Sequence, residues 1–260
     1  GPAATRALRQ LVDASGKMVL LDKLLPRLRA EGRKLLIFSQ FTRMLDLLED
    51  YLHLARLPCE RLDGSVAGPA RQASIDRFQR GGAEQAFVFL LSTRAGGVGI
   101  NLTAADTVVI FDSDWNPQND VQGMARCHRI GQTQQVQVYR LITNNTYEKG
   151  MFERSCQKLG LDQALLGSGG GDKAGDKGPS GAEVVDLLKY GAYNIMQEDE
   201  ESEAARRKFC EADIDELLAQ GHKLQHGGAS GAGGAFSKAT FSSEGAAGEH
   251  KVDLHDPEFW

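Results

Sequence analysis

Two arginines, Arg126 and Arg129, stand three residues apart within the string QGMARCHRIGQ at positions 122–132. On a helix, side chains at this spacing lie on one face, so both guanidiniums could reach a single polyphosphate. Arginine suits this task because it stays charged and can donate two parallel hydrogen bonds to phosphate oxygens. An isolated pair of this kind is usually just solvated, but the surrounding string favours a role in stabilising a transferring phosphoryl group.

A glycine-rich turn follows an apolar segment at positions 87–91. It contains three glycines, Gly96, Gly97 and Gly99. Because glycine has no Cβ, the backbone amides of such a turn can approach a phosphate closely. Position 102 is a leucine, so the turn does not match the GxGxxG dinucleotide fingerprint. Together with Thr93 and Arg94 just before it, the turn predicts a contact with a nucleic-acid backbone.

The elements that must position these residues alternate along the first part of the chain. Short segments rich in β-branched and aromatic residues predict strands at 35–38, 59–62, 87–91, 108–111 and 136–142. Amphipathic patterns predict helices at 17–31, 42–56, 69–79, 117–128 and 146–160. This alternation predicts an α/β fold, with a parallel sheet covered by helices on both faces. Ligands of such folds gather at the carboxyl ends of the strands. Three polar pairs each follow a predicted strand: Ser39-Gln40, Asp63-Gly64 and Ser92-Thr93.

Several blocks, in this order, resemble motifs of the superfamily 2 helicase-like ATPases in the SWI/SNF-type variant. KLLIFSQ at 34–40 resembles motif IV, RLDGS at 61–65 the next element, STRAGGVGINL at 92–102 motif V, and the string at 122–132 motif VI. DSDWNP at 112–117 and ARCHR at 125–129 are similar to the chromodomain-helicase-DNA-binding family of chromatin remodellers. Segments 186–193 and 209–218 are similar to its Kismet-like subgroup. The resemblance covers residues 15–220 and implies a RecA-like C-terminal helicase lobe.

The resemblance implies a set of residues that face the backbone of duplex DNA: Ser39, Gln40, Thr93, Arg94, Gly96 and Gly97. It also places Trp115 close to the duplex, although a tryptophan ahead of Pro117 could equally anchor the core. Asp63 and Gly64 would contact DNA or form a tight turn. Contacts of this sort grip phosphates rather than bases, so binding is expected to be independent of sequence and weakened by salt.

The resemblance further implies that Arg126 and Arg129 complete an ATP site from across a cleft, with Gly99 and Gln132 nearby. The sequence contains no GxxxxGK[ST] loop for the phosphates and no Asp-Glu-x-His segment for Mg²⁺. ATP with Mg²⁺ is therefore expected to need a first RecA-like lobe of the same polypeptide, and this chain alone is expected to be inactive. Gly123 stands where the family usually has alanine, which adds backbone freedom to a helix.

The amino-acid composition limits the classes of partner and site that the chain could have, but it does not identify its function. Residues 1–166 carry 21 Lys and Arg against 17 Asp and Glu, whereas residues 167–260 carry 9 against 18. A mildly basic front half fits a phosphate-bearing partner, although many enzymes that never bind nucleic acid are as basic. The four cysteines are far apart and form no CxxC pair, so no metal site is predicted. No apolar run is long enough to span a bilayer, so no membrane partner is expected.

Four segments are expected along the chain. Residues 1–166 form the RecA-like lobe, and residues 167–181 are a glycine-rich linker or insertion. Residues 182–220 form a helical bracing segment, with helices near 181–192 and 211–220 and a solvated acidic run at 198–203. Residues 221–260 are dominated by Gly, Ala and Ser and are expected to be a disordered tail.

These patterns predict the second motor lobe of an ATP-dependent chromatin remodeller, which translocates on duplex DNA and slides nucleosomes in the nucleus. Two alternatives stay open. The chain could be a non-catalytic regulatory module that binds DNA or a partner protein, or part of a repair-type translocase of the same superfamily. An upstream reading frame encoding a Walker A lysine would favour a motor over a module. A strand-displacement assay would test the repair-type reading.

Overall fold

The computed structural model describes residues 1–66, 68–96, 100–124, 127, 135–144, 146–152, 154, 200–220, 223–226 and 239–242. The chain divides into two compact units, Gly1–Glu203 and Ala204–Trp260. The segment boundaries expected after residues 166 and 181 lie outside the described residues. Of the helices in the described part of the chain, none combines the length and the apolar character that crossing a bilayer requires.

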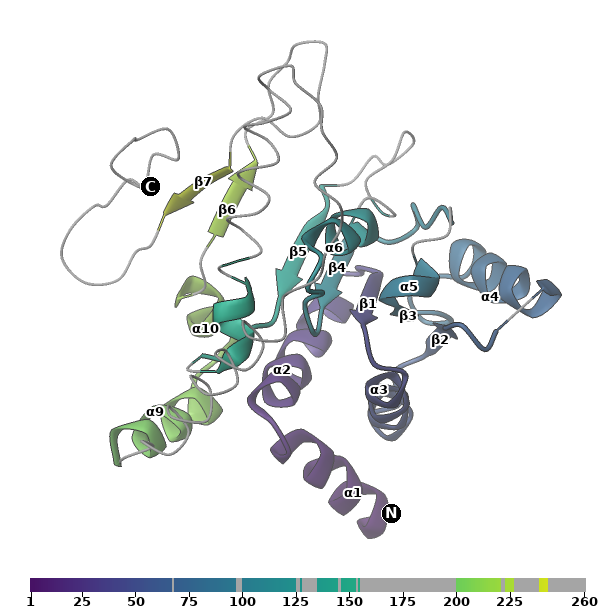
Figure 1. Ribbon diagram of the computed structural model, residues 1–260. Helices are drawn as coiled ribbons and strands as arrows, with labels where there is room; N and C mark the ends of the chain where they lie inside the picture. Colours follow the sequence, from purple (N-terminus) through teal and green to yellow (C-terminus); the bar gives the residue numbers. More distant parts are fainter. Residues whose placement is uncertain are drawn as a thin grey trace, which may run out of the picture. The chain divides into compact units, whose positions relative to one another are not determined.

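The first unit contains a five-stranded parallel sheet with the strand order β2-β3-β1-β4-β5 (Figure 1). The strands are β1 (Leu35–Ser39), β2 (Cys59–Leu62), β3 (Val88–Ser92), β4 (Thr107–Ile110) and β5 (Gln137–Arg140). All five strand predictions are therefore confirmed. Strands β1, β3 and β4 are buried along their whole length. This burial explains why they read as continuous apolar runs rather than as alternating ones.

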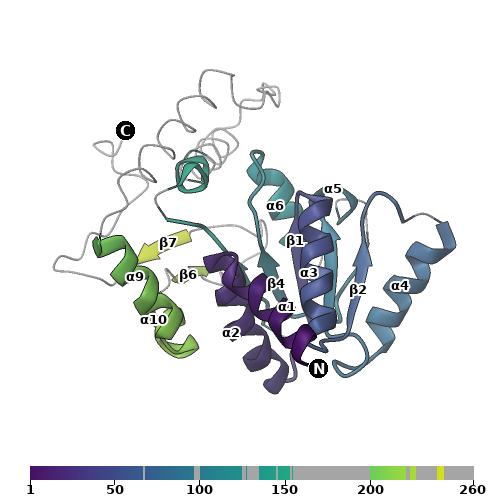
Figure 2. The ribbon, with the colours of Figure 1, turned by 90° about the horizontal axis from the view of Figure 1, so that it is seen from below.

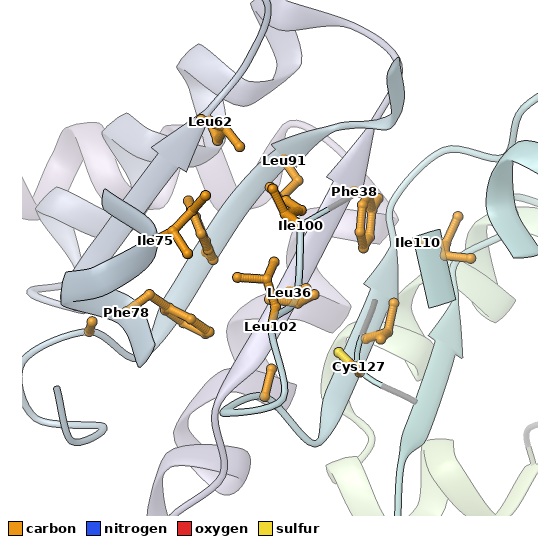
Figure 3. Close-up of a cluster of buried hydrophobic side chains, with 14 residues drawn as sticks. Leu36, Phe38, Leu62, Ile75, Phe78, Leu91, Ile100, Leu102, Ile110 and Cys127 are labelled. Atoms are coloured by element: carbon orange, nitrogen blue, oxygen red, sulfur yellow. The ribbon is translucent and has the colours of Figure 1, made fainter. Parts of the chain in front are cut away.

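Helices cover both faces of the sheet, as predicted. On one face, Leu36 and Phe38 of β1 belong to a buried cluster with Ile75 and Phe78 of α4 (Gly68–Arg80) (Figure 3). The rings of Phe78 and Phe89 lie 5.0 Å apart in this cluster. The other face is covered by α3 (Thr42–Leu54), which contacts β1, β2 and β3 and carries three buried leucines (Figure 2).

Two further helices pack beside α3. Helix α2 (Gly16–Ala30) begins after Ser15, whose hydroxyl accepts a hydrogen bond from the backbone N–H of Met18 at 3.2 Å. It ends at Ala30, and Gly32 just after the C-cap residue Glu31 adopts a left-handed φ of 71° that glycine accepts without strain. Helix α1 (Pro2–Asp13) contacts α2 and α3 and has no buried residue, and it precedes the first helix predicted from the sequence, at 17–31.

Gly123 lies in α6 (Pro117–Met124) with its backbone against the ring of Phe38. A Cβ at this position would meet ring atoms of Phe38 at 3.4 to 3.6 Å, which is ordinary van der Waals contact. We expect Gly123→Ala to raise the free energy of unfolding by about 0.5 to 1 kcal/mol, because alanine loses less backbone entropy in a helix. Urea denaturation measures the change. Gly32→Ala is the control and should destabilise the protein, since its φ is left-handed.

The second unit holds the C-terminal elements, apart from the first four residues of α9. Helix α9 (Glu200–Glu211) begins inside the acidic run that was expected to be solvated, and it is followed by α10 (Ile214–Gln220). The acidic residues fall in the first turn of α9 and Lys208 in its last turn, an arrangement that the helix dipole favours. Strands β6 (Lys223–His226) and β7 (Ala239–Ser242) pair antiparallel within the stretch for which the sequence predicts no regular structure. The helix expected near 181–192 lies outside the described residues.

Candidate nucleic-acid and nucleotide interface

The predicted DNA-facing residues that the structure describes stand at the carboxyl edge of the sheet. In strand order they are Asp63 and Gly64 after β2, Thr93, Arg94 and Gly96 in α5 (Thr93–Gly96) after β3, Ser39 and Gln40 at the end of β1, and Trp115 after β4. Ser39 lies opposite Ser92 in the β1–β3 pairing, so the ends of these two strands are neighbours. Trp115 is half-buried. Five further predicted residues lie outside the described residues: Gly97, Gly99, Arg126, Arg129 and Gln132.

Asp112 ties the end of β1 to the loop after β4. The Ser39 hydroxyl donates to one oxygen of its carboxylate at 2.5 Å, and the backbone N–H of Gln40 donates to the other at 2.7 Å. The side-chain amide of Gln40 donates to the carbonyl of Ser113. Ser39 is fully buried, so its hydroxyl is engaged inside the protein, and Gln40 carries the accessible surface of this pair. Burial raises the pKa of Asp112, whereas these hydrogen bonds and the charge of Lys17 oppose the rise.

Lys17 reaches the same region from the first turn of α2. Its ammonium group donates to the carbonyl of Phe111 at 2.7 Å and forms an ion pair with Glu148. The other oxygen of Glu148 accepts a hydrogen bond from the backbone N–H of Thr143 at 3.0 Å. Lys17 therefore connects the start of α2 to the segments that follow β4 and β5.

Arg140, the last residue of β5, contacts the start of α6. Its guanidinium forms an ion pair with Asp120 and donates to the hydroxyl of Ser113 at 2.8 Å. The guanidinium carbon also lies 5.1 Å from the centre of the Phe152 ring, within the range of a cation–π contact. Asp120 is buried and accepts a second hydrogen bond, from the backbone N–H of Asp114, at 3.2 Å. Burial raises the pKa of Asp120, and the charge of Arg140 opposes this rise.

Thr93 and Arg94 offer two donors at the end of β3. Thr93 is 6% exposed, and within the described residues its hydroxyl is buried without a hydrogen-bond partner. Leaving a buried hydroxyl unpaired costs free energy, and a ligand that reached this strand end and accepted its hydrogen bond would offset that cost. The side chain of Arg94 is exposed beside it. A phosphate is the kind of ligand that a hydroxyl and a guanidinium can bind together.

Gln79 of α4 holds the segment that follows the glycine-rich turn. Its side-chain amide donates to the carbonyl of Asn101 at 2.6 Å and accepts from the backbone N–H of Ala104 at 2.9 Å. Leu102, between these two residues, is fully buried. The segment after the turn is thus held by both a polar and an apolar contact. No pattern in the sequence singles out this glutamine.

Comparison with known proteins assigns the family. Residues 16–131 match the family model of the helicase conserved C-terminal domain. The chain is 52% identical over 256 residues to human chromodomain-helicase-DNA-binding protein 7, an alignment covering 97% of this chain and 8% of that protein. It is 55% identical over 256 residues to zebrafish chromodomain-helicase-DNA-binding protein 8, covering 97% of this chain and 10% of that protein. The chain belongs to the chromodomain-helicase-DNA-binding family.

The predicted family and the RecA-like helicase C-terminal fold are thereby confirmed. A crystal structure of the C-terminal part of the Fun30 ATPase domain superimposes with a TM-score of 0.52 at 42% identity, covering 54% of this chain and 45% of that one. The chain spans a tenth or less of the length of the chromodomain-helicase-DNA-binding relatives named above. Arg140 and Glu148, which hold two of the contacts described above, lie beyond the matched helicase domain.

The turn at Asp63 in this chromodomain-helicase lobe is closed by its own carboxylate. One oxygen accepts hydrogen bonds from the backbone N–H and the hydroxyl of Ser65, at 2.8 and 2.5 Å. The other pairs with Arg61 at 2.7 Å, and Arg61 also pairs with Asp46 and Glu49. Asp63 is 3% exposed. Its carboxylate therefore shapes the turn that presents Gly64.

We expect Asp63→Asn to lower the free energy of unfolding at neutral pH by about 1 to 3 kcal/mol, because hydrogen bonds to a charged group are lost. The Ser65 hydroxyl, helped by Arg61, holds the pKa of Asp63 below its ordinary value of 3.8. Such a carboxyl adds stability that is present above the unfolded pKa and is lost as the pH falls through the folded pKa. Urea unfolding should therefore show the difference shrinking as the pH drops below 3.8.

Asp46→Asn is the matched control for this prediction. Asp46 pairs with the same Arg61, but its side chain is 58% exposed. Exposed ion pairs contribute little, so this change should cost less than about 1 kcal/mol. A cost for Asp63→Asn that stayed constant with pH would contradict the role of its charge.

Proposed function

We propose that this chain is the second motor lobe of an ATP-dependent chromatin remodeller that translocates on duplex DNA and slides nucleosomes in the nucleus. The observation that supports it best is the position of Gln40, Thr93 and Arg94 at one edge of a parallel sheet, in a chain of the chromodomain-helicase-DNA-binding family. Open α/β sheets bind ligands at this edge. The donors found there suit a phosphate backbone rather than base edges.

The residues at this edge would share the work of holding DNA. Thr93 and Arg94 would bind phosphates directly, and the backbone of Gly96 and Gly97 would approach the strand closely. Ser39 would act from inside, by fixing the loop that carries Gln40. The remaining candidates would lie beside these phosphate contacts: Asp63, Gly64 and Trp115.

The ATP site would lie between this lobe and a first RecA-like lobe of the same polypeptide. Arg126 and Arg129 would reach the phosphates, with Gly99 and Gln132 nearby. In the described part of the chain, no three metal-binding side chains come together. The Mg²⁺ ligands are assigned to the first lobe, because the sequence contains no Asp-Glu-x-His segment. Mg²⁺ supplies charge neutralisation at the β- and γ-phosphates when bound.

Repeated closure of the two lobes would couple ATP hydrolysis to movement along DNA. ATP bound between the lobes would draw both guanidiniums onto its phosphates, and the loss of the γ-phosphate would release them. Because the DNA-binding edge and the string at 122–132 belong to one lobe, closure would carry the grip along the duplex. Repeated closure and opening would then move DNA past the protein.

The test compares ATP hydrolysis by this chain alone with that of the chain joined to its first lobe, with and without duplex DNA. The joined protein should hydrolyse ATP and should be stimulated by DNA, and the chain alone should not. The joined protein with its Walker lysine replaced is the control for contaminating ATPases. Hydrolysis by the chain alone would contradict the division of the site between two lobes.

The same proteins separate the alternatives. A joined protein that binds DNA without hydrolysing ATP would indicate a non-catalytic module. Separation of the strands of a plain duplex would instead indicate a repair-type motor. Sliding of a nucleosome without strand separation is the result we expect.

A further inference from the structure

We propose that Arg140 is a positioning residue that acts on motor turnover by holding the helix that leads to Arg126. The inference rests on the proposed function, because Arg126 must act on ATP for its position to matter. Arg140 lies outside the matched helicase domain, at the end of the edge strand β5. Its link to the nucleotide site is the ion pair with Asp120 in the first part of α6.

Arg140 contacts residues of three segments of the chain. Its guanidinium binds Asp120 in α6 and the hydroxyl of Ser113 in the loop before α6, and it packs on the ring of Phe152. The side chains of Arg140 and Asp120 are 21% and 3% exposed, so the ion pair is partly shielded from water and is weakened less by salt than a surface pair. Asp120 also accepts from the backbone N–H of Asp114. The start of α6 is therefore held from the strand side and from the loop side.

A second anchor follows Arg126 directly in the sequence. Cys127, the next residue, is fully buried in the cluster that includes Val108 and Ile110 of β4 (Figure 3). Burial, with a smaller effect from Asp106, raises the pKa of its thiol to about 12. The thiol therefore stays neutral and packs as a small apolar group. Arg126 thus stands in the sequence between an ion-paired residue six positions earlier and a buried residue directly after it.

Two anchors around a long charged side chain have a specific consequence for catalysis. A guanidinium that stabilises charge at a transferring phosphoryl group works best when its position is set before the reaction. Loosening α6 would reduce this preorganisation, so it would lower the rate of the chemical step more than the affinity for ATP. A lysine at position 140 could pair with Asp120 but could not keep the planar, multiple contacts of arginine.

The decisive experiment measures DNA-stimulated ATP hydrolysis by the full-length protein carrying Arg140→Met. We expect kcat to fall by about 10- to 100-fold, the size of effect that a small misplacement of a catalytic group produces. The KM for ATP should change little, and Arg140→Lys should recover part of the loss. Arg80→Met, which removes an 82% exposed arginine from a surface ion pair, is the control and should behave as wild type.

A double substitution tests whether Arg140 acts through Arg126. If it does, adding Arg140→Met to Arg126→Ala should lower kcat no further, because the group being positioned is already absent. A further loss equal to that of the single Arg140→Met would overturn the inference. Normal turnover by Arg126→Ala alone would instead overturn the proposed function, so the two failures are distinguishable.

Hydrogen exchange on this 260-residue chain gives a readout that needs no motor activity. In Arg140→Met, the amides of residues 118–127 should exchange faster than in the wild type, and those of β1 should not change. Faster exchange throughout the sheet would show a general loss of stability and would overturn the inference, as would unchanged exchange in residues 118–127.

Discussion

Replacing Arg129 by alanine in the protein joined to its first lobe is expected to lower kcat for ATP hydrolysis by about 1,000-fold or more, the contribution of an arginine finger. Arg126→Ala should have an effect of similar size, because both guanidiniums would meet the same polyphosphate. DNA affinity should be nearly unchanged in both variants, since the residues proposed to face DNA follow β1, β2, β3 and β4, and neither arginine is among them. Steady-state hydrolysis and DNA binding by fluorescence anisotropy measure the two properties.

Arg94→Ala is the matched comparison, because it removes an exposed arginine from the edge that we propose binds DNA. It should weaken DNA binding and reduce the dependence of log K on log salt by about one phosphate contact, while kcat at saturating DNA changes little. Arg129→Ala would then affect ATP hydrolysis alone, and Arg94→Ala would affect DNA binding alone. An Arg129→Ala protein that hydrolysed ATP at the wild-type rate would show that the finger assignment is wrong.

Glu148→Gln is expected to lower the free energy of unfolding by about 3 kcal/mol, because it leaves the partner of a buried ion pair uncompensated. The side chains of Lys17 and Glu148 are 15% and 10% exposed, so water cannot replace the lost partner fully. The pair joins positions 131 residues apart, and its loss should loosen α2 from the region after β5. Urea unfolding followed by circular dichroism measures the change.

Two further proteins make this prediction specific. Glu31→Gln removes a 38% exposed partner of Arg27 and Arg33 and should cost less than about 1 kcal/mol. The double variant Lys17→Met with Glu148→Leu should be more stable than Glu148→Gln alone, because it leaves no unpaired charge in the site. A double variant less stable than the single one would mean that the contact of Lys17 with the Phe111 carbonyl matters more than the ion pair.

The candidate site was partly accessible to sequence reasoning. Thr93 and Arg94 were placed correctly at a strand end, because a short apolar run followed by polar residues marks the point where a buried parallel strand stops. The buried state of Ser39 and the closed ion network of Asp63 were not evident, since a sequence does not show which oxygen a side chain meets. Lys17 illustrates the same limit, because its partner Glu148 lies 131 positions away in the sequence.

The family, the alternation of strands and helices, and the parallel sheet were determined by the sequence alone. They follow from the spacing of apolar residues and from motif strings, and both signals depend only on residues that are close together in the sequence. Only the tertiary structure decided that Arg140 holds Asp120, that Lys17 holds Glu148 and that Gln79 fastens the segment after the glycine-rich turn. These partners are 20 to 131 positions apart, and side chains so distant have no common period, so only folding brings them within bonding distance.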